Sequence, residues 1–136
     1  MIRAYLIFFG EGDARAWWDV FTRTGFRHVC AAGFDPESDR WVFVDPHRRG
    51  MDVLVLPEED ATSRLGVWAT AASAVLRVEV GRERAAMPAV FGCVGAIKAL
   101  IGHRSRALSP FGLHRHLLRH GAERIEVPSG NVARGR

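Results

Sequence analysis

Two strand-like runs joined by one turn constrain the fold more than any other feature of the sequence. Residues 26–34 and 40–44 are rich in aromatic and β-branched side chains, and Asp-Pro-Glu-Ser-Asp fills positions 35–39. Proline presets the backbone dihedral angle of a type I turn, and an aspartate before it can accept the hydrogen bond of the turn. The pattern therefore predicts an antiparallel hairpin, with Pro36 and Glu37 as the two central turn residues.

This turn also predicts which side chains of the hairpin meet. It sets His28 opposite Asp45 and Cys30 opposite Phe43. Directly opposed residues share one face of a sheet, with Cβ atoms ~5 Å apart, whereas a slip of one residue in register would put them on opposite faces. A carboxylate beside an imidazole can hold its tautomer and stabilise its protonated form. We therefore expect Asp45 to orient His28.

The remaining segments predict one α+β domain. Further strands are expected at residues 2–9, 50–57 and 75–80, and helices at residues 13–25, 61–73, 93–102 and 110–120. The expected architecture over residues 1–127 is an antiparallel sheet of about four to five strands with helices packed against it. Trp17 and Trp18, in the first of these helices, are interpreted as core and capping residues. Residues 128–136 are rich in Gly, Ser and Arg and are predicted to be a mobile basic tail.

A thiol at the predicted start of a helix is the main chemical signal. The run Phe91-Gly92-Cys93-Val94 opens an amphipathic stretch that ends at Gly102. The unpaired N–H groups and the positive dipole end of a helix stabilise a thiolate and can hold an oxyanion. Cys93 is therefore a candidate nucleophile, and His28 is the first candidate for its base.

Each of these residues also has a structural interpretation. Cys93 could be an inert buried thiol, because free cysteine packs as a small hydrophobic residue. His28 could be a structural histidine with a single backbone partner. Asp45 precedes a proline and could be a turn residue, in which case Asp52 or Glu79 would have to orient the imidazole.

Two other groups of residues are assigned structural roles. Cys30 is most simply a core residue, two positions along the strand from His28. The histidines at positions 114, 116 and 120 could suggest zinc, because His116 and His120 lie one helical turn apart. Arginines interleave them and no cysteine or carboxylate lies nearby in sequence, which favours a solvated helix face.

Composition and charge narrow the classes of function. The chain has 136 residues, 48% of them hydrophobic and 25% charged, which suits one ordinary globular domain. The net charge is +4, and Lys98 is the only lysine. The basic tract at residues 103–120 has few aromatic residues among its charges, and an acidic stretch follows Pro57, so direct nucleic-acid binding is disfavoured.

The same composition predicts the compartment. No apolar run approaches the ~18 residues that cross a bilayer, and residues 1–10 lack the length and cleavage site of a secretory signal. We therefore expect no membrane association, a cytoplasmic or virion-associated location, and reduced thiols at both cysteines.

Four short motifs occur in an informative order. They are Phe26-Arg27-His28; Trp41-Val42-Phe43-Val44-Asp45-Pro46; Cys93-Val94 with Ile97-Lys98 and Leu100-Ile101-Gly102; and Ser109-Pro110 with Leu113 and Leu117. A strand histidine, a polar residue on the next strand and a later cysteine at a helix start resemble the circularly permuted papain-like hydrolases of the NlpC-type superfamily. Over residues 26–120 the motifs are also similar to those of small uncharacterised proteins from phages, prophages and proteobacterial genomes.

The resemblance implies a permuted papain-like cysteine hydrolase with Cys93 as nucleophile, His28 as base and Asp45 as orienting residue. The expected substrate is a peptide, an isopeptide or an acyl ester, and no metal or organic cofactor is required. The alternative is a catalytically inactive structural or interaction protein of a phage-like particle, with other particle proteins as partners. A nucleic-acid-associated accessory protein is the third class.

Overall fold

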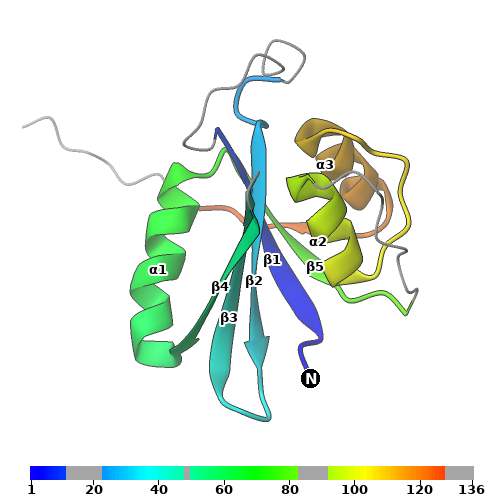
Figure 1. Cartoon of the computed structure of the whole chain (residues 1–136). Coiled ribbons are helices and arrows are strands. Elements are labelled where there is room, and N and C mark those ends of the chain that lie inside the picture. Colours follow the sequence, from blue (N-terminus) through cyan, green and yellow to red (C-terminus); the bar gives the residue numbers. More distant parts are fainter. Residues whose placement is uncertain (12–22, 48–49, 83–91, 128–136) are drawn as a thin grey trace, which may run out of the picture.

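A computed structural model describes residues 1–11, 23–47, 50–82 and 92–127 of the chain. Its strands are β1 (Ala4–Gly10), β2 (His28–Asp35), β3 (Arg40–His47), β4 (Gly50–Pro57), β5 (Ala74–Glu79) and β6 (Glu123–Arg124). Its helices are α1 (Glu58–Ala71), α2 (Cys93–Ile101) and α3 (Pro110–Arg119). The strands form one antiparallel sheet in the order β4-β3-β2-β1-β5-β6, with the helices packed against it (Figure 1).

The predicted α+β class and antiparallel sheet are confirmed, but the predicted number of strands is too low. The sheet has six strands, where about four to five were expected. The additional strand, β6, is only two residues long and pairs Arg124 with Leu76. Two residues carry no alternation of hydrophobic and polar side chains, so no sequence pattern could reveal them.

The other predicted elements mostly match the structure. The segment predicted as a helix at residues 61–73 is helical from Glu58, directly after Pro57, and three acidic side chains occupy its first turn. Negative charge there complements the positive end of the helix dipole. The predicted tail at residues 128–136 lies outside the described residues, as does almost all of the predicted helix at residues 13–25 with its two tryptophans.

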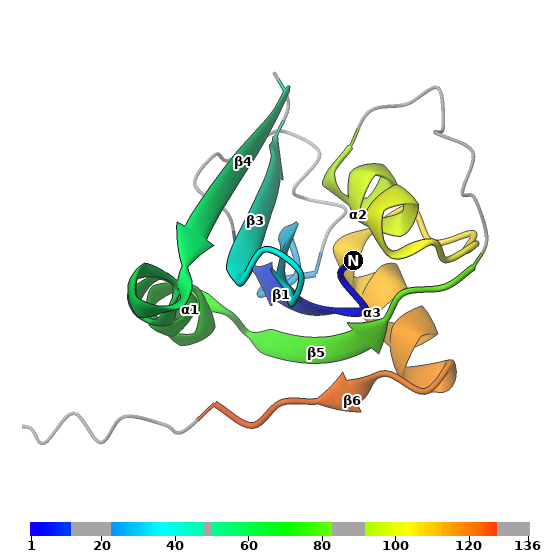
Figure 2. The ribbon, with the colours of Figure 1, turned by 90° about the horizontal axis from the view of Figure 1, so that it is seen from below.

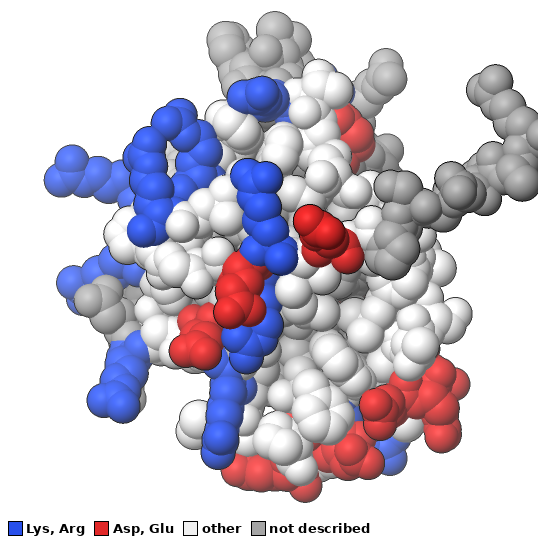
Figure 3. All heavy atoms as spheres, turned by 180° about the vertical axis from the view of Figure 1, so that it is seen from behind, with Lys and Arg blue, Asp and Glu red and all other residues white. Residues whose placement is uncertain are grey.

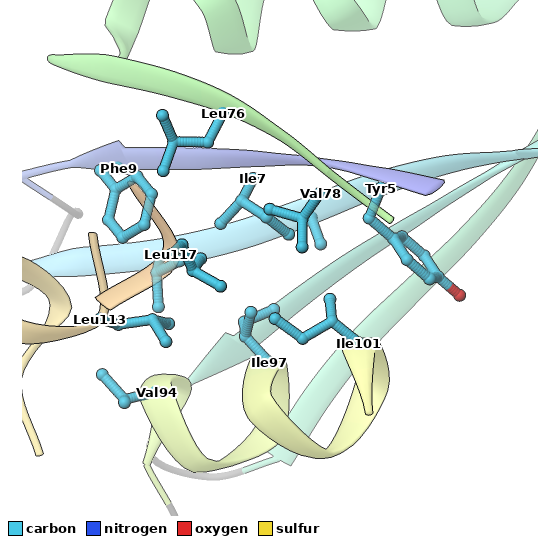
Figure 4. Packing of buried hydrophobic residues seen from close by; sticks show 12 residues of the cluster. Tyr5, Ile7, Phe9, Leu76, Val78, Val94, Ile97, Ile101, Leu113 and Leu117 are labelled. Carbon is cyan, nitrogen blue, oxygen red and sulfur yellow. The ribbon is translucent and has the colours of Figure 1, made fainter. Parts of the chain in front are cut away.

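The sheet is strongly curved, and helices cover both of its faces. Figure 2 shows β3 and β4 rising at an angle to β5, with α2 and α3 on the inner side of the curve and α1 on the outer side. The inner core contains twelve buried residues, most of which are labelled in Figure 4, among them Ile7, Phe9 and Leu113. The outer core is smaller and includes Phe8 and Phe43 packed with Trp68 of α1. Because both faces of β1 are buried, this strand lies at the centre of the fold.

Some strands that pair in the sheet follow one another in sequence, whereas others come from distant parts of the chain. Strands β2, β3 and β4 follow one another in sequence and are neighbours in the sheet. Strand β1 instead pairs with β2 on one side and with β5 on the other, where Ala4 lies opposite Glu79. The centre of the sheet therefore depends on contacts between distant parts of the chain.

Candidate active site

His28 and Asp45 come from neighbouring strands, but not from opposite positions. The β2–β3 ladder pairs Ala31 with Val44 at this end, and neither His28 nor Asp45 is among its paired residues. This ladder is shifted by two positions from the predicted register, in which His28 was set opposite Asp45. A shift of two positions keeps every side chain on its face of the sheet, so His28 and Asp45 are diagonal neighbours on one face.

The error comes from the loop of the hairpin. The residues between the paired ends of β2 and β3 are four, at positions 36–39, instead of the two predicted. Asp39 has a φ of 55°, in the left-handed region that aspartate tolerates better than most residues. As a result Phe43 lies opposite Ala32 and not, as predicted, opposite Cys30.

A short hydrogen bond joins the imidazole to the carboxylate. His28 Nε2 lies 2.6 Å from Asp45 Oδ1, and the two side chains are 26% and 43% exposed. Burial lowers the pKa of His28, but hydrogen bonds with the side chains of Asp45 and Cys93, and the charges of both, raise it to about 9. The imidazole is therefore a cation at neutral pH, held between a carboxylate and a thiol.

Cys93 is the first residue of α2, as the sequence predicted. Gly92 is the N-cap, with an extended backbone and no capping side chain, and its carbonyl accepts the hydrogen bond of Ala96 at 3.0 Å. The first N–H groups of a helix have no hydrogen-bond partner within the helix. In α2 these N–H groups lie at the end of the helix that carries the Cys93 thiol. Position 93 thus combines a half-buried thiol with the positive end of a helix dipole.

Apolar side chains fix α2 against the sheet. Val94, Ile97 and Ile101 are buried in the inner core, and α2 packs over β2 and β3. The helix ends at Gly102, whose φ of 67° is the left-handed conformation typical of a helix C-terminus. Lys98 Nζ donates hydrogen bonds to two backbone carbonyls of the following segment, both at 3.0 Å. These contacts hold the start of α2 beside the hairpin.

Cys30 belongs to the site and not only to the core. Ligand-type atoms of His28, Cys30 and Asp45 all lie within 4.8 Å of one another. Burial raises the pKa of the Cys30 thiol, and the nearby charges of Asp45 and Cys93 raise it further. Sequence reasoning assigned Cys30 to the core, although its spacing of two residues from His28 on one strand is a signal that the side chains share a face.

The alternative orienting residues have other partners. Asp52 Oδ2 lies 3.4 Å from His47 Nε2, and Glu79 Oε1 lies 3.8 Å from Arg77. Of the three carboxylates considered from the sequence, Asp45 is the one hydrogen-bonded to His28. The geometry therefore favours Asp45 for the orienting role.

The three histidines of α3 do not form a metal site in the described part of the chain. The prediction of a solvated face is wrong for His114, which is buried and packs against Phe9, Phe26 and Phe111. The rings of His116 and His120 stack with centroids 4.1 Å apart, and His120 Nδ1 hydrogen-bonds to the carbonyl of His116. Desolvation by burial lowers the pKa of His114, so its ring is a neutral core group.

Charges of both signs share the surface that faces away from Figure 1. Figure 3 shows Lys and Arg side chains along one side of this surface and Asp and Glu gathered at the opposite lower edge. On β5 and β6, Arg77 lies 3.8 Å from Glu79 and 3.9 Å from Glu123. Among the helices described, none has the length and apolar character needed to span a membrane.

Comparisons of the chain with protein-family models, with curated proteins and with solved structures found no match.

Proposed function

We propose that the chain is a cysteine hydrolase in which Cys93 is the nucleophile, His28 the base and Asp45 the orienting residue. The observation that supports this is one continuous set of contacts. Asp45 Oδ1 lies 2.6 Å from His28 Nε2, and the Cys93 side chain lies near enough to His28 to help raise the pKa of its imidazole. A nucleophile, a base and a group that orients the base are the three parts that activated-thiol chemistry requires.

The proposed reaction has two steps. The proton of the Cys93 thiol resides on the imidazolium of His28, and the Cys93 sulfur attacks the carbonyl carbon of an amide or ester. Backbone N–H groups at the start of α2 stabilise the oxyanion, and the imidazolium of His28 protonates the leaving amine or alcohol. A water molecule, deprotonated by His28, then attacks the thioester, releases the acid and restores the thiol.

The fold supports the same proposal in a limited way. We infer a permuted papain-like arrangement from the order of the parts: the histidine strand, the carboxylate strand and later the cysteine helix. In the structure α2 packs over β2 and β3, which carry the other two residues. The proposed substrates are a peptide, an isopeptide or an acyl ester.

Selective alkylation at pH 6 tests the nucleophile. An ordinary thiol with a pKa of about 8.5 is almost wholly protonated at this pH. We expect iodoacetamide to label Cys93 about 10- to 100-fold faster than free glutathione, because a thiolate paired with His28 is already formed. Peptide mass analysis after timed labelling separates Cys93 from Cys30, which should label slowly.

Labelling of Cys93 no faster than glutathione would contradict the nucleophile assignment. It would favour the alternative, a non-catalytic structural or interaction protein that uses the thiol only for packing. Hydrolysis of small acyl esters and of peptides by the parent protein, and its loss in Cys93→Ala, would extend the test from reactivity to turnover.

The substitution Asp45→Asn tests the orienting role. The amide keeps the shape of the carboxylate but removes the charge, so we expect the free energy of unfolding to fall by about 1 kcal/mol or less. Alkylation of Cys93 at pH 6 should fall about tenfold, because the imidazolium loses its carboxylate partner. The matched control is Glu79→Gln, which removes the exposed carboxylate 3.8 Å from Arg77 on β5 and should change neither quantity appreciably. Equal labelling in both variants would assign Asp45 to the hairpin alone.

A further inference from the structure

The candidate site contains more potential ligands than a hydrolase needs. The chain has two cysteines, and both lie at the His28–Asp45 pair. One nitrogen of His28, the Cys30 sulfur and one carboxylate oxygen of Asp45 lie within 4.8 Å of one another. The Cys93 side chain interacts with both His28 and Cys30, but its sulfur lies outside the group of atoms within 4.8 Å of one another. The proposed hydrolase mechanism gives Cys30 no role.

These donors match one class of metal ion. Thiolate and imidazole ligands with one carboxylate suit zinc and the similar divalent transition metals, whereas magnesium and calcium prefer oxygen ligands alone. Metal–ligand bonds of about 2.0–2.3 Å in a tetrahedron place neighbouring ligand atoms ~3.3–3.8 Å apart. The 2.6 Å hydrogen bond between His28 and Asp45 would have to open slightly, and the Cys93 sulfur, which lies outside the 4.8 Å group, would have to move toward it. Side-chain rotations on a sheet surface can supply shifts of this size.

We propose that His28, Cys30 and Asp45 bind a divalent transition metal of the zinc class, with Cys93 as the fourth ligand. Binding replaces protons with the metal ion. The Cys30 thiol releases its proton to solvent, the Cys93 sulfur binds as thiolate, and the imidazolium of His28 loses one ring proton so that a nitrogen lone pair can coordinate. No electron transfer takes place.

The burial of the site favours a bound cation. Cys30 is half-buried beside the carboxylate of Asp45, and a metal ion bound between them would be ligated by both. The metal and the imidazolium use the same His28 and Cys93 atoms and therefore exclude each other. Metal binding would block the nucleophile of the proposed hydrolase, but the metal site does not depend on that function.

Cobalt and zinc titrations of the metal-free full-length protein test the proposal, with a non-thiol reductant and no histidine tag. We expect one equivalent of Co²⁺ to give a sulfur-to-metal charge-transfer band and the strong visible bands of a tetrahedral site, and Zn²⁺ to displace it. Competition with a chromophoric chelator measures the zinc affinity. Cys30→Ser should weaken it about 100-fold, because a hydroxyl is a poor ligand for zinc. Circular dichroism and thermal melting verify that the variant is folded.

Two further variants separate the metal site from its surroundings. Glu79→Gln, which removes the exposed carboxylate beside Arg77 on β5, should leave the zinc affinity unchanged. Cys93→Ala should abolish the proposed hydrolysis yet retain zinc with about tenfold weaker affinity through the other three ligands. The absence of a charge-transfer band in the parent, or an unchanged affinity in Cys30→Ser, would overturn the proposal. Unchanged affinity in Cys93→Ala would overturn the assignment of the fourth ligand. None of these results bears on alkylation of the metal-free protein, so the metal proposal and the hydrolase proposal can fail separately.

Discussion

Replacing His28 by alanine is expected to lower the alkylation rate of Cys93 at pH 6 by about 10- to 100-fold. In the parent protein the imidazole is a cation over most of the accessible pH range, since its pKa is raised to about 9. It can therefore stabilise a neighbouring thiolate well below the pH at which an ordinary thiol ionises. Without the imidazolium, the thiol has to ionise with the help of the helix dipole alone.

The pH dependence makes this prediction sharper. Below pH 9 the parent keeps its imidazolium, so its labelling rate should change little between pH 6 and pH 8. The His28→Ala variant should instead label about tenfold faster for each unit of pH, as the fraction of free thiolate grows. The control is His120→Ala, which removes an exposed imidazole at the C-terminal end of α3, on a different part of the fold. Parallel pH profiles for the parent and His28→Ala would rule out the ion pair.

The largest expected loss of stability follows from truncating Phe9. This side chain is fully buried at the centre of the inner core, and its ring centroid lies 5.9 Å from that of Phe26 and 5.1 Å from that of His114 (Figure 4). Removal of a buried aromatic ring from a packed core costs the transfer energy of the ring and leaves a cavity. We expect Phe9→Ala to lower the free energy of unfolding by about 3–5 kcal/mol.

Chemical denaturation, followed by circular dichroism, measures this difference. Val67→Ala is the matched control, because Val67 is 63% exposed on α1 and should change the free energy of unfolding by about 0.5 kcal/mol or less. Similar small effects from the two substitutions would mean that the inner core does not carry the stability of the fold.

Local patterns in the sequence predict most of the fold. The turn of the hairpin, the alternation in β5 and the cap at Ser109 are signals confined to a few neighbouring residues. Ser109 accepts a hydrogen bond from the backbone of Gly112 at 3.1 Å, and Pro110 follows it at the first turn of α3. Such signals suffice because the physical cause acts within one turn of helix or one strand.

The errors arise where distant parts of the chain decide the outcome. The length of the hairpin loop depends on Asp39 adopting a left-handed backbone, which its residue type permits but does not require. His114 lies beside Leu113 on α3, and its burial results from packing of α3 against Phe9 of β1, more than a hundred residues away in sequence. The direct contact of Cys30 with the site depends on a register that the same loop sets.

The closeness of His28 and Asp45 rests on a general property of sheets. His28 and Asp45 remained on one face although the predicted register was wrong, because the error was an even number of residues. The start of α2 at Cys93 was predictable from glycine before an amphipathic run. Local patterns could not predict that Cys93 lies near His28 and Asp45, and this proximity was inferred from the order of the motifs.

The uneven order of strand pairing has a consequence for how the molecule reaches its final state. Strands β2, β3 and β4 form a meander whose contacts are local, and such contacts close with little loss of chain entropy. The pairing of Ala4 with Glu79 closes a far longer loop and is correspondingly slower to form. The hairpin that carries His28 and Asp45 can thus assemble early, whereas α2 must wait for the centre of the sheet before Cys93 has a surface to pack on. A thiol that becomes reactive only at that stage would act as a built-in reporter of the completed fold, silent in chains that are still partly assembled.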